Sequence, residues 1–420
     1  MSVARIPRAR APSTRGASTL RVVRRYGTND ENLLVHADNL VALRDLARSF
    51  AGQIRCVYLD PPFNTGRSFA EYNDSLATGD WVTMMRPRLE ALMPLLAEDA
   101  SVFVEIDDTQ LAHLTLLMDE VLGAKNRIST ITVVRSATTG HKAINAGPVH
   151  VSDFVLAYAK DKKKWRYRPQ VRLRQGLDPA YSTWLDEPDH APTRWTFRPL
   201  RAAIAGLLGH ASAREAVRVL GREGFARRMI DLALESARHV VRFAQPRYEA
   251  IGRAAQEIVD RSRAAPSRVL VLQRDGRAPF IVRGGNRILF LADKVRVVAG
   301  RPSIVEPLTN VWTDVPFQGI AREGGVVFTR NKKPERLVSR VLAMATDAGD
   351  WVLDPFLGSG TTAAVAHKMG RRWIGIEAGA HLTTLAEPRL ARVVAGEDAT
   401  GITAETGFTG GGGFSVLEPS

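Results

Sequence analysis

Two short motifs, far apart in the chain, carry the side chains that could do chemistry. The first is Asp-Pro-Pro-Phe-Asn-Thr-Gly at residues 60–66, directly after an apolar run that predicts a buried strand. Its two prolines fix the backbone, so the Asp60 carboxylate and the Pro61 carbonyl can form a pair of acceptors suited to an NH2 group. Phe63 offers a flat face on which a planar base could stack, a contact worth roughly 1–3 kcal/mol. The other interpretation is a strand-ending turn with structural prolines.

The second motif is Asp-Pro-Phe-Leu-Gly-Ser-Gly-Thr-Thr at residues 354–362, between an expected strand and an expected helix. Gly358 and Gly360 permit a tight turn and a close approach of the backbone to a ligand. The helix that begins near Thr361 offers free N–H groups to a carboxylate. The next strand ends at Glu377, where an acidic residue commonly accepts hydrogen bonds from ribose hydroxyls. Because the motif lacks Gly-Lys-Thr, a phosphate-binding loop is disfavoured.

Both motifs lie in segments where apolar strands alternate with amphipathic helices. Strands are expected at residues 54–59, 101–106, 128–134, 151–159, 351–353 and 373–376, and helices at 39–50, 81–96, 110–122, 334–345 and 361–369. This alternation predicts a Rossmann-like, doubly wound α/β fold with a mostly parallel sheet. Ligands of such sheets bind at the carboxyl ends of the strands, where both motifs are expected.

The middle of the chain does not follow this alternation. Residues 200–264 have helical periodicity, and residues 268–298 alternate as strands do around glycine turns. We interpret this region as an insertion between two halves of one α/β domain. The expected division is a flexible basic arm (1–25), an α/β half that carries the first motif (26–160), a mixed helical and β insertion (161–305), an α/β half that carries the second motif (306–400) and a loose glycine-rich tail (401–420).

The composition is typical of a globular protein, and the excess of positive charge is concentrated in the insertion. Of 420 residues, 45% are hydrophobic, and the single cysteine, Cys56, excludes an internal disulfide. No apolar run is long enough to span a membrane, and we expect a cytoplasmic protein.

The net charge is +14, made of +7 in residues 1–25, −7 in 26–159, +16 in 160–305 and −2 in 306–420. A basic insertion favours a polyanionic partner, with solubilising surface charge as the alternative.

Together the motifs resemble the β class of amino-methyltransferases that use S-adenosyl-methionine, and more closely the modification subunits of type III restriction systems. The resemblance covers residues 34 to about 160 and 310 to about 392. Its further blocks are Asp38-Asn39, Tyr72-Asn73-Asp74, Trp81 with Pro87-Arg88-Leu89, Ile106-Asp107-Asp108, Asn331-Lys332-Lys333-Pro334 and the tail 411–414. In this class the catalytic motif precedes the cofactor motif, with the target-recognition region between them. The resemblance thus implies a circularly permuted methyltransferase fold and a DNA-binding insertion.

Carried over to this sequence, the resemblance implies a role for each motif. Asp60 and Pro61, followed by Pro62, would accept hydrogen bonds from the exocyclic amine of a flipped-out base, and Phe63 would stack on it. The residues expected to bind S-adenosyl-methionine are Asp38, Asn331, Lys332, Asp354, Phe356, Gly358, Ser359, Gly360, Thr361 and Glu377. The nine histidines show no metal-ligand spacing, so we expect no metal site.

Aspartate rather than serine at position 60 favours adenine N6 over cytosine N4 as the methylated amine. Phe63 stands where the class usually has tyrosine, which leaves stacking intact but removes a hydroxyl. A cytosine N4 methyltransferase and a non-catalytic DNA-binding relative stay open as alternatives. The resemblance implies double-stranded DNA as partner and leaves open a homodimer and a restriction subunit. The insertion is short for a type III subunit, which favours a solitary enzyme.

Overall fold

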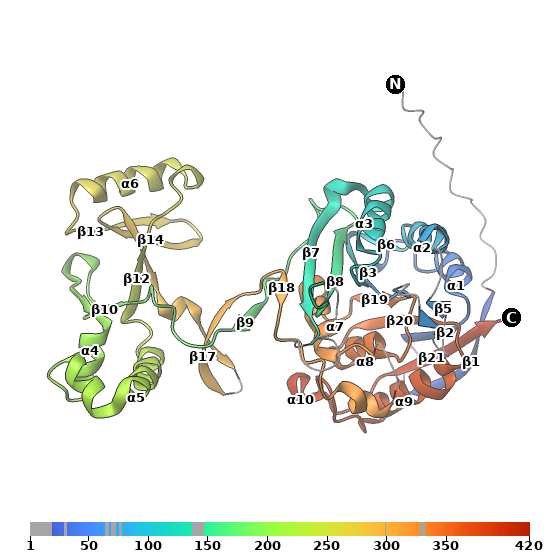
Figure 1. Cartoon of the computed structure of the whole chain (residues 1–420). Helices are drawn as coiled ribbons and strands as arrows, with labels where there is room; N and C mark the ends of the chain where they lie inside the picture. The colour runs from blue at the N-terminus through green and yellow to red at the C-terminus, as the bar shows by residue number, and fades with distance from the viewer. Residues whose placement is uncertain are drawn as a thin grey trace. The chain divides into compact units, whose positions relative to one another are not determined.

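The chain folds into two compact units in a computed structural model (Figure 1). The first unit comprises Met1–Gln170 with Thr309–Ser420, and the second comprises Val171–Leu308. The structure describes residues 19–28, 32–63, 67–68, 73–74, 78–136, 147–298, 300–327 and 332–420. The second unit begins and ends somewhat later than the insertion expected at residues 161–305. Within the described residues, no helix is both long and apolar enough to cross a membrane.

A ten-stranded sheet forms the centre of the first unit, in the order β1-β21-β2-β20-β19-β3-β6-β8-β7-β18. Eight of these strands run in one direction, and only β1 and β8 run in the other. The strands are β1 (Leu20–Gly27), β2 (Asn32–His36), β3 (Ile54–Leu59), β6 (Leu96–Ile106), β7 (Arg127–Val134), β8 (Ser152–Ala159), β18 (Val311–Trp312), β19 (Trp351–Asp354), β20 (Arg372–Glu377) and β21 (Gly413–Pro419). A separate pair is formed by β4 (Arg67–Ser68) and β5 (Asn73–Asp74). The expected α/β class with a mostly parallel sheet is confirmed.

Helices cover both faces of this sheet (Figure 1). On one face lie α1 (Asn39–Leu46), α2 (Thr78–Leu92) and α3 (Leu111–Met118), and on the other α7 (Glu335–Ala345), α8 (Thr361–Lys368) and α9 (Glu387–Ala395); the short α10 (Thr403–Thr406) follows. Apart from the half-buried Arg55, every residue of strand β3 is buried, as expected for a strand covered by helices on both faces. Each strand and helix expected in the outer segments is present, with ends shifted by five residues or fewer.

Both ends of the described chain belong to the sheet, which corrects two expectations. The arm expected over residues 1–25 is strand β1 from Leu20 onward, and the tail expected to be loose ends in β21, which pairs with both β1 and β2. The pairing buries apolar and aromatic surface, since Tyr26 stacks on Phe414 with ring centroids 4.7 Å apart. Residues 1–18 lie outside the described residues.

The second unit is a mixed helical and β structure, as expected for the insertion. It contains a six-stranded sheet in the order β11-β10-β12-β15-β14-β13 and a three-stranded sheet in the order β16-β17-β9. The strands are β9 (Val171–Leu173), β10 (Thr183–Leu185), β11 (Phe197–Pro199), β12 (Val240–Ala244), β13 (Val269–Arg274), β14 (Arg277–Arg283), β15 (Asn286–Phe290), β16 (Val295–Val298) and β17 (Arg301–Pro307). The helices are α4 (Leu200–Leu207), α5 (Ala213–Glu235) and α6 (Arg253–Ala264). Strand β12 interrupts the region expected to be helical.

Candidate active site

Three neighbouring parallel strands bring the two motifs together at one edge of the sheet. Strand β19 lies between β20 and β3, and all three run in the same direction. Their carboxyl ends carry Glu377, Asp354 and Asp60. One pocket forms there, lined by Tyr58, Asp60, Pro61, Pro62, Phe63, Lys333, Val338, Asp354, Phe356, Leu357, Gly358, Ser359, Thr361, Thr362, Glu377 and His381. Eleven of these residues come from the two motifs, so residues almost 300 positions apart share one site.

The Asp60 end of the pocket pairs a carboxylate with a lysine. Lys333 Nζ donates to Asp60 Oδ1 at 2.6 Å and lies 4.4 Å from the centroid of the Phe63 ring. The loop that carries Asp60 is also held by α2, because the Trp81 indole donates to the Pro62 carbonyl at 2.7 Å. Asp60 stays 22% exposed, whereas the side chain of Lys333 is only 7% exposed. The acceptor pair at the strand end therefore faces the pocket with a cation already beside it.

Further buried charges lie close to Asp60. Glu105 on β6 is fully buried, 3.3 Å from Lys333 Nζ, and accepts a hydrogen bond from the Tyr58 hydroxyl. Asp153 on β8 is also fully buried and pairs with Arg135 at 2.9 Å. Burial raises the pKa of Asp60 to about 7, against the lowering effect of Lys333. Burial alone would lower the pKa of Lys333, but the carboxylates of Asp60, Glu105 and Asp153 raise it above its ordinary value. Lys333 is therefore charged at neutral pH.

The other end of the pocket is built by the glycine-containing motif. Asp354 accepts a hydrogen bond from the Phe356 N–H at 2.9 Å, and burial raises the pKa of Asp354 to about 7. Glu377 accepts hydrogen bonds from the Gly358 N–H at 3.0 Å and the Gly379 N–H at 2.8 Å. Burial would raise the pKa of Glu377, but the neighbouring His381 and these amides lower it below its ordinary value. The Glu377 carboxylate is therefore ionised at the pocket wall.

Three of the residues predicted to bind a cofactor do not line this pocket, and a fourth, Asn331, lies outside the described residues. Gly360 ends the turn behind the pocket with a φ of +83°, a backbone conformation that favours glycine, so its role is in the turn. Asp38 caps α1 by accepting from the Leu40 and Val41 amides. Lys332 is buried and donates to the backbone carbonyls of residues 321, 323 and 326.

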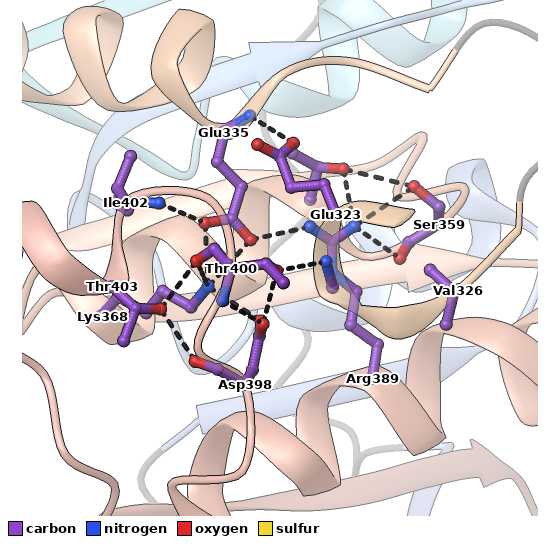
Figure 2. Close-up of polar contacts among 12 residues, drawn as sticks. Glu323, Val326, Glu335, Ser359, Lys368, Arg389, Asp398, Thr400, Ile402 and Thr403 are labelled. Carbon is purple, nitrogen blue, oxygen red and sulfur yellow. Dashed lines mark hydrogen bonds and ion pairs between the residues drawn. The ribbon is translucent and has the colours of Figure 1, made fainter. Parts of the chain in front are cut away.

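A buried polar network behind the glycine turn was not predicted from the sequence (Figure 2). Arg389 of α9 donates to the Ser359 carbonyl at 3.2 Å and to the Thr361 hydroxyl at 2.8 Å. The same guanidinium pairs with Glu335 of α7 at 2.8 Å, and Glu335 pairs with Lys368 of α8 at 2.9 Å. Three helices thus hold the turn from behind. An arginine at residue 389 in an amphipathic helix carries no sequence signal for this role, because its partners come from other elements.

Two further polar residues, which belong to the quoted sequence blocks but were given no role, complete the site. Lys333 contacts Asp60 although it sits beside the predicted Lys332, because successive residues before a helix point in different directions. Asn39, next to the predicted Asp38, donates to the Pro355 carbonyl at 2.9 Å and so joins α1 to the second motif. Among the described residues, no group of three or more His, Cys, Asp or Glu side chains is placed to hold a metal ion.

The chain matches a known protein family. A family model described as DNA methylase matches residues 54–219 and 290–388, which is more than half of the chain. The match includes Asp60, Lys333, Asp354 and Glu377, and therefore both ends of the pocket.

Two curated relatives are named as Mod subunits of type III restriction-modification enzymes. The chain is 29% identical over 430 aligned positions to a probable type III restriction-modification enzyme HindVI Mod subunit from Haemophilus influenzae, covering 93% of this chain and 54% of the relative. It is 25% identical over 376 positions to the StyLTI Mod subunit of Salmonella typhimurium, covering 80% and 49%. The chain spans about half the length of these curated relatives. A solved structure from Thermus thermophilus, a putative DNA modification methylase complexed with S-adenosyl-L-methionine, is 13% identical with a TM-score of 0.40, covering 93% of this chain and 100% of the other.

Proposed function

Because this chain belongs to the DNA methylase family, we propose that it transfers a methyl group from S-adenosyl-methionine to the exocyclic N6 amine of adenine in DNA. One observation carries the proposal. The acceptor pair at Asp60-Pro61, after β3, and the ionised Glu377, at the end of β20, lie in a single pocket at the carboxyl ends of these strands, with only β19 between them. That arrangement supports the proposal of a site for an amine next to a site for a ribose-containing cofactor.

The catalytic end of the pocket supplies acceptors and a stacking face. The Asp60 carboxylate and the Pro61 carbonyl would accept the two N–H groups of the target amine and leave its nitrogen lone pair directed away from them. Phe63 would hold the ring plane by stacking. Since burial raises the pKa of Asp60 to about 7, its free oxygen can accept a proton from the methylated amine near neutral pH. The chain's own contribution is therefore positioning, electrostatics and proton acceptance.

The other end of the pocket fits S-adenosyl-methionine. When bound, the cofactor supplies an electrophilic methyl group on a sulfonium. An ionised carboxylate has about four acceptor positions, so Glu377 keeps capacity for a ribose hydroxyl beyond its two amide bonds and its ion pair with His381 at 3.3 Å. Phe356 and Gly358 wall the pocket, the first as an apolar surface and the second as backbone without a side chain. Asp38 and Lys332 do not line the pocket, so they would not contact the cofactor and would only stabilise the segments around the pocket.

The second unit would bind DNA and let the enzyme reach the base. Residues 171–308 hold 24 Lys and Arg against 14 Asp and Glu, a net charge of +10. Phosphate contacts from such a surface can offset the few kcal/mol needed to extrude a base from the duplex. By analogy with the Mod relatives, we propose a role in restriction-modification in the cytoplasm. A restriction subunit and a homodimer are further proposals.

The base and the activity are tested together. The protein is incubated with labelled S-adenosyl-methionine and mixed-sequence DNA, and the DNA is digested to nucleosides. We expect label in N6-methyladenine. Label in N4-methylcytosine would overturn the base assignment in favour of the alternative that the acceptor pair also allows. Cofactor binding without any label in DNA would overturn the activity and favour a non-catalytic DNA-binding protein.

A further inference from the structure

Lys333 lies in the position that the target amine of the proposed function would need. Its Nζ donates to Asp60 at 2.6 Å, as an exocyclic amine would, and lies 4.4 Å from the Phe63 ring centroid, as a stacked base would. The cation is almost fully enclosed, with 7% of the side chain exposed. In this arrangement a base could not donate to Asp60 Oδ1 and stack on Phe63 without displacing the ammonium.

A second acceptor lies within reach of the same ammonium. Glu105 is fully buried and its Oε1 lies 3.3 Å from Lys333 Nζ, yet it accepts no hydrogen bond from a described residue. Its other oxygen accepts from the Tyr58 hydroxyl, so the carboxylate is held in place. A buried carboxylate oxygen without a hydrogen bond is costly, which favours its use in a second state of the site. A small movement of Nζ would exchange Asp60 for Glu105.

We propose that Lys333 is a positioning residue that holds Asp60 while no base is bound and transfers to Glu105 when the target amine takes its place. The proposal rests on the proposed function and adds a step to it. No covalent bond changes in this exchange, because one ammonium–carboxylate hydrogen bond replaces another. Before the base binds, Lys333 favours the ionised form of Asp60 and holds its carboxylate in place. After the base binds, Lys333 stays on Glu105 and still provides a positive charge near Asp60.

The charges around Asp60 make the proposal testable by pH. Asp60 is faced by Lys333 before α7, by Glu105 on β6, by Asp153 on β8 with Arg135 beyond it, and by Asp354 on β19. Lys333 and Arg135 lower the pKa of Asp60, and Glu105 raises it. The rate of methyl transfer should fall at low pH as Asp60 becomes protonated, and this fall is the acidic limb of the pH–rate profile. Removing the lysine and removing the glutamate charge must therefore shift the acidic limb in opposite directions.

The experiment measures methyl transfer across a pH series from mildly acidic to alkaline for Lys333→Met and Glu105→Gln. For Lys333→Met we expect kcat at neutral pH to fall at least about tenfold, the acidic limb to move up by roughly one pH unit or more, and the KM for DNA not to rise.

For Glu105→Gln we expect the acidic limb to move down and the plateau kcat to fall, because the ammonium has lost its second acceptor. Cofactor affinity should stay within about twofold for both, since the cofactor end of the pocket is unchanged. Acidic limbs that do not move, or that move in the same direction, would overturn the proposal.

Matched controls separate this proposal from its premise and from misfolding. Lys164→Met removes an exposed lysine that pairs with Glu98 and should leave the whole profile unchanged. If Lys333→Met does not fold, Lys333→Ala is assayed with added ethylammonium, and a saturable recovery of kcat supports the exchange while no recovery contradicts it. A wild-type protein that methylates no base would refute the proposed function itself. An active wild type with unshifted variants would refute only the role of Lys333.

Discussion

Asp60 and Asp354 end neighbouring strands, yet their surroundings differ in one respect. Asp60 has the Lys333 ammonium at 2.6 Å, whereas Asp354 is held by the Phe356 amide and has no ion pair among the described residues. Burial raises the pKa of both to about 7. The two carboxyl groups therefore suit different tasks: Asp60 faces the proposed substrate with a counter-ion beside it, and Asp354 shapes the turn that follows.

Replacing Asp60 by alanine should reduce methyl transfer severely. The change removes an acceptor aimed at the target amine, and losing one such group in a preorganised site costs roughly 100- to 1,000-fold in rate. Cofactor affinity should stay within about twofold, because Glu377 and the glycine turn lie at the other end of the pocket. Single-turnover kinetics and cofactor titration by calorimetry measure the two quantities. Rapid transfer by the variant would show that the acceptor pair is wrongly assigned.

Asp354→Asn should make stability less sensitive to pH. The pKa of Asp354 is raised in the folded protein, so its stabilising contribution is complete below the unfolded pKa of about 4 and is lost as pH rises through about 7. Asparagine can still accept from the Phe356 amide but does not ionise. The free energy of unfolding of the variant minus that of the wild type should therefore increase between about pH 4 and about pH 7, by at most about 1.4 kcal/mol per pH unit. Urea denaturation at about pH 5 and about pH 8 measures this, and equal differences at both pH values would contradict it.

At the scale of elements, the glycine turn is held in place by helices that are distant in sequence. Arg389 on α9 reaches the turn, while Glu335 on α7 and Lys368 on α8 complete a fully buried network (Figure 2). Asp398 adds a second carboxylate to Lys368 at 2.8 Å, so two cations face two anions. Breaking one member leaves an uncompensated buried charge, which costs far more than the intact pair contributes.

Arg389→Met should lower the free energy of unfolding by about 3–5 kcal/mol, because Glu335 loses a buried partner and the Ser359 carbonyl loses its donor. Arg336→Met is the matched control: its exposed pair with Glu405 should contribute at most about 1 kcal/mol. Chemical denaturation of both variants gives the comparison. Similar losses for the two arginines would mean that the network does not carry the expected energy.

At the scale of the whole molecule, the net charge of +14 divides unevenly. The second unit holds +10, and the four arginines of residues 1–18 account for the remaining +4, so the rest of the first unit is balanced. In the second unit, α5 presents a run of exposed arginines at residues 214, 218, 222, 227 and 228. The helix is kinked at Gly221, where φ is +72°, so these arginines do not share one face. Exposed guanidinium groups of this kind suit contact with phosphates rather than reading of bases.

DNA affinity should therefore fall steeply with salt, and the slope should depend on α5. Each phosphate contact contributes about 0.9 to the slope of log affinity against log salt, so Arg218→Gln with Arg222→Gln should reduce it by up to about 2. Arg86→Gln in the first unit, which removes an exposed pair with Glu120, should leave the slope unchanged. Fluorescence anisotropy between roughly 50 and 200 mM salt, where counterion release has a large effect, measures it. A slope unaffected by the α5 changes would remove this helix from the DNA contact.

By itself the sequence determined the α/β class, the positions of the strands and helices in the outer segments, and both motifs of the pocket. Those properties depend on local periodicity and on strand ends, which neighbouring residues set. Tertiary structure alone decided that Lys333 meets Asp60, that Arg389 reaches the turn, and that β1 pairs with β21. Each of these contacts joins residues that are distant in the chain, and a lysine or arginine side chain carries no local signal for its partner. The glycine-rich tail looked loose because composition does not show that its last residues complete a sheet.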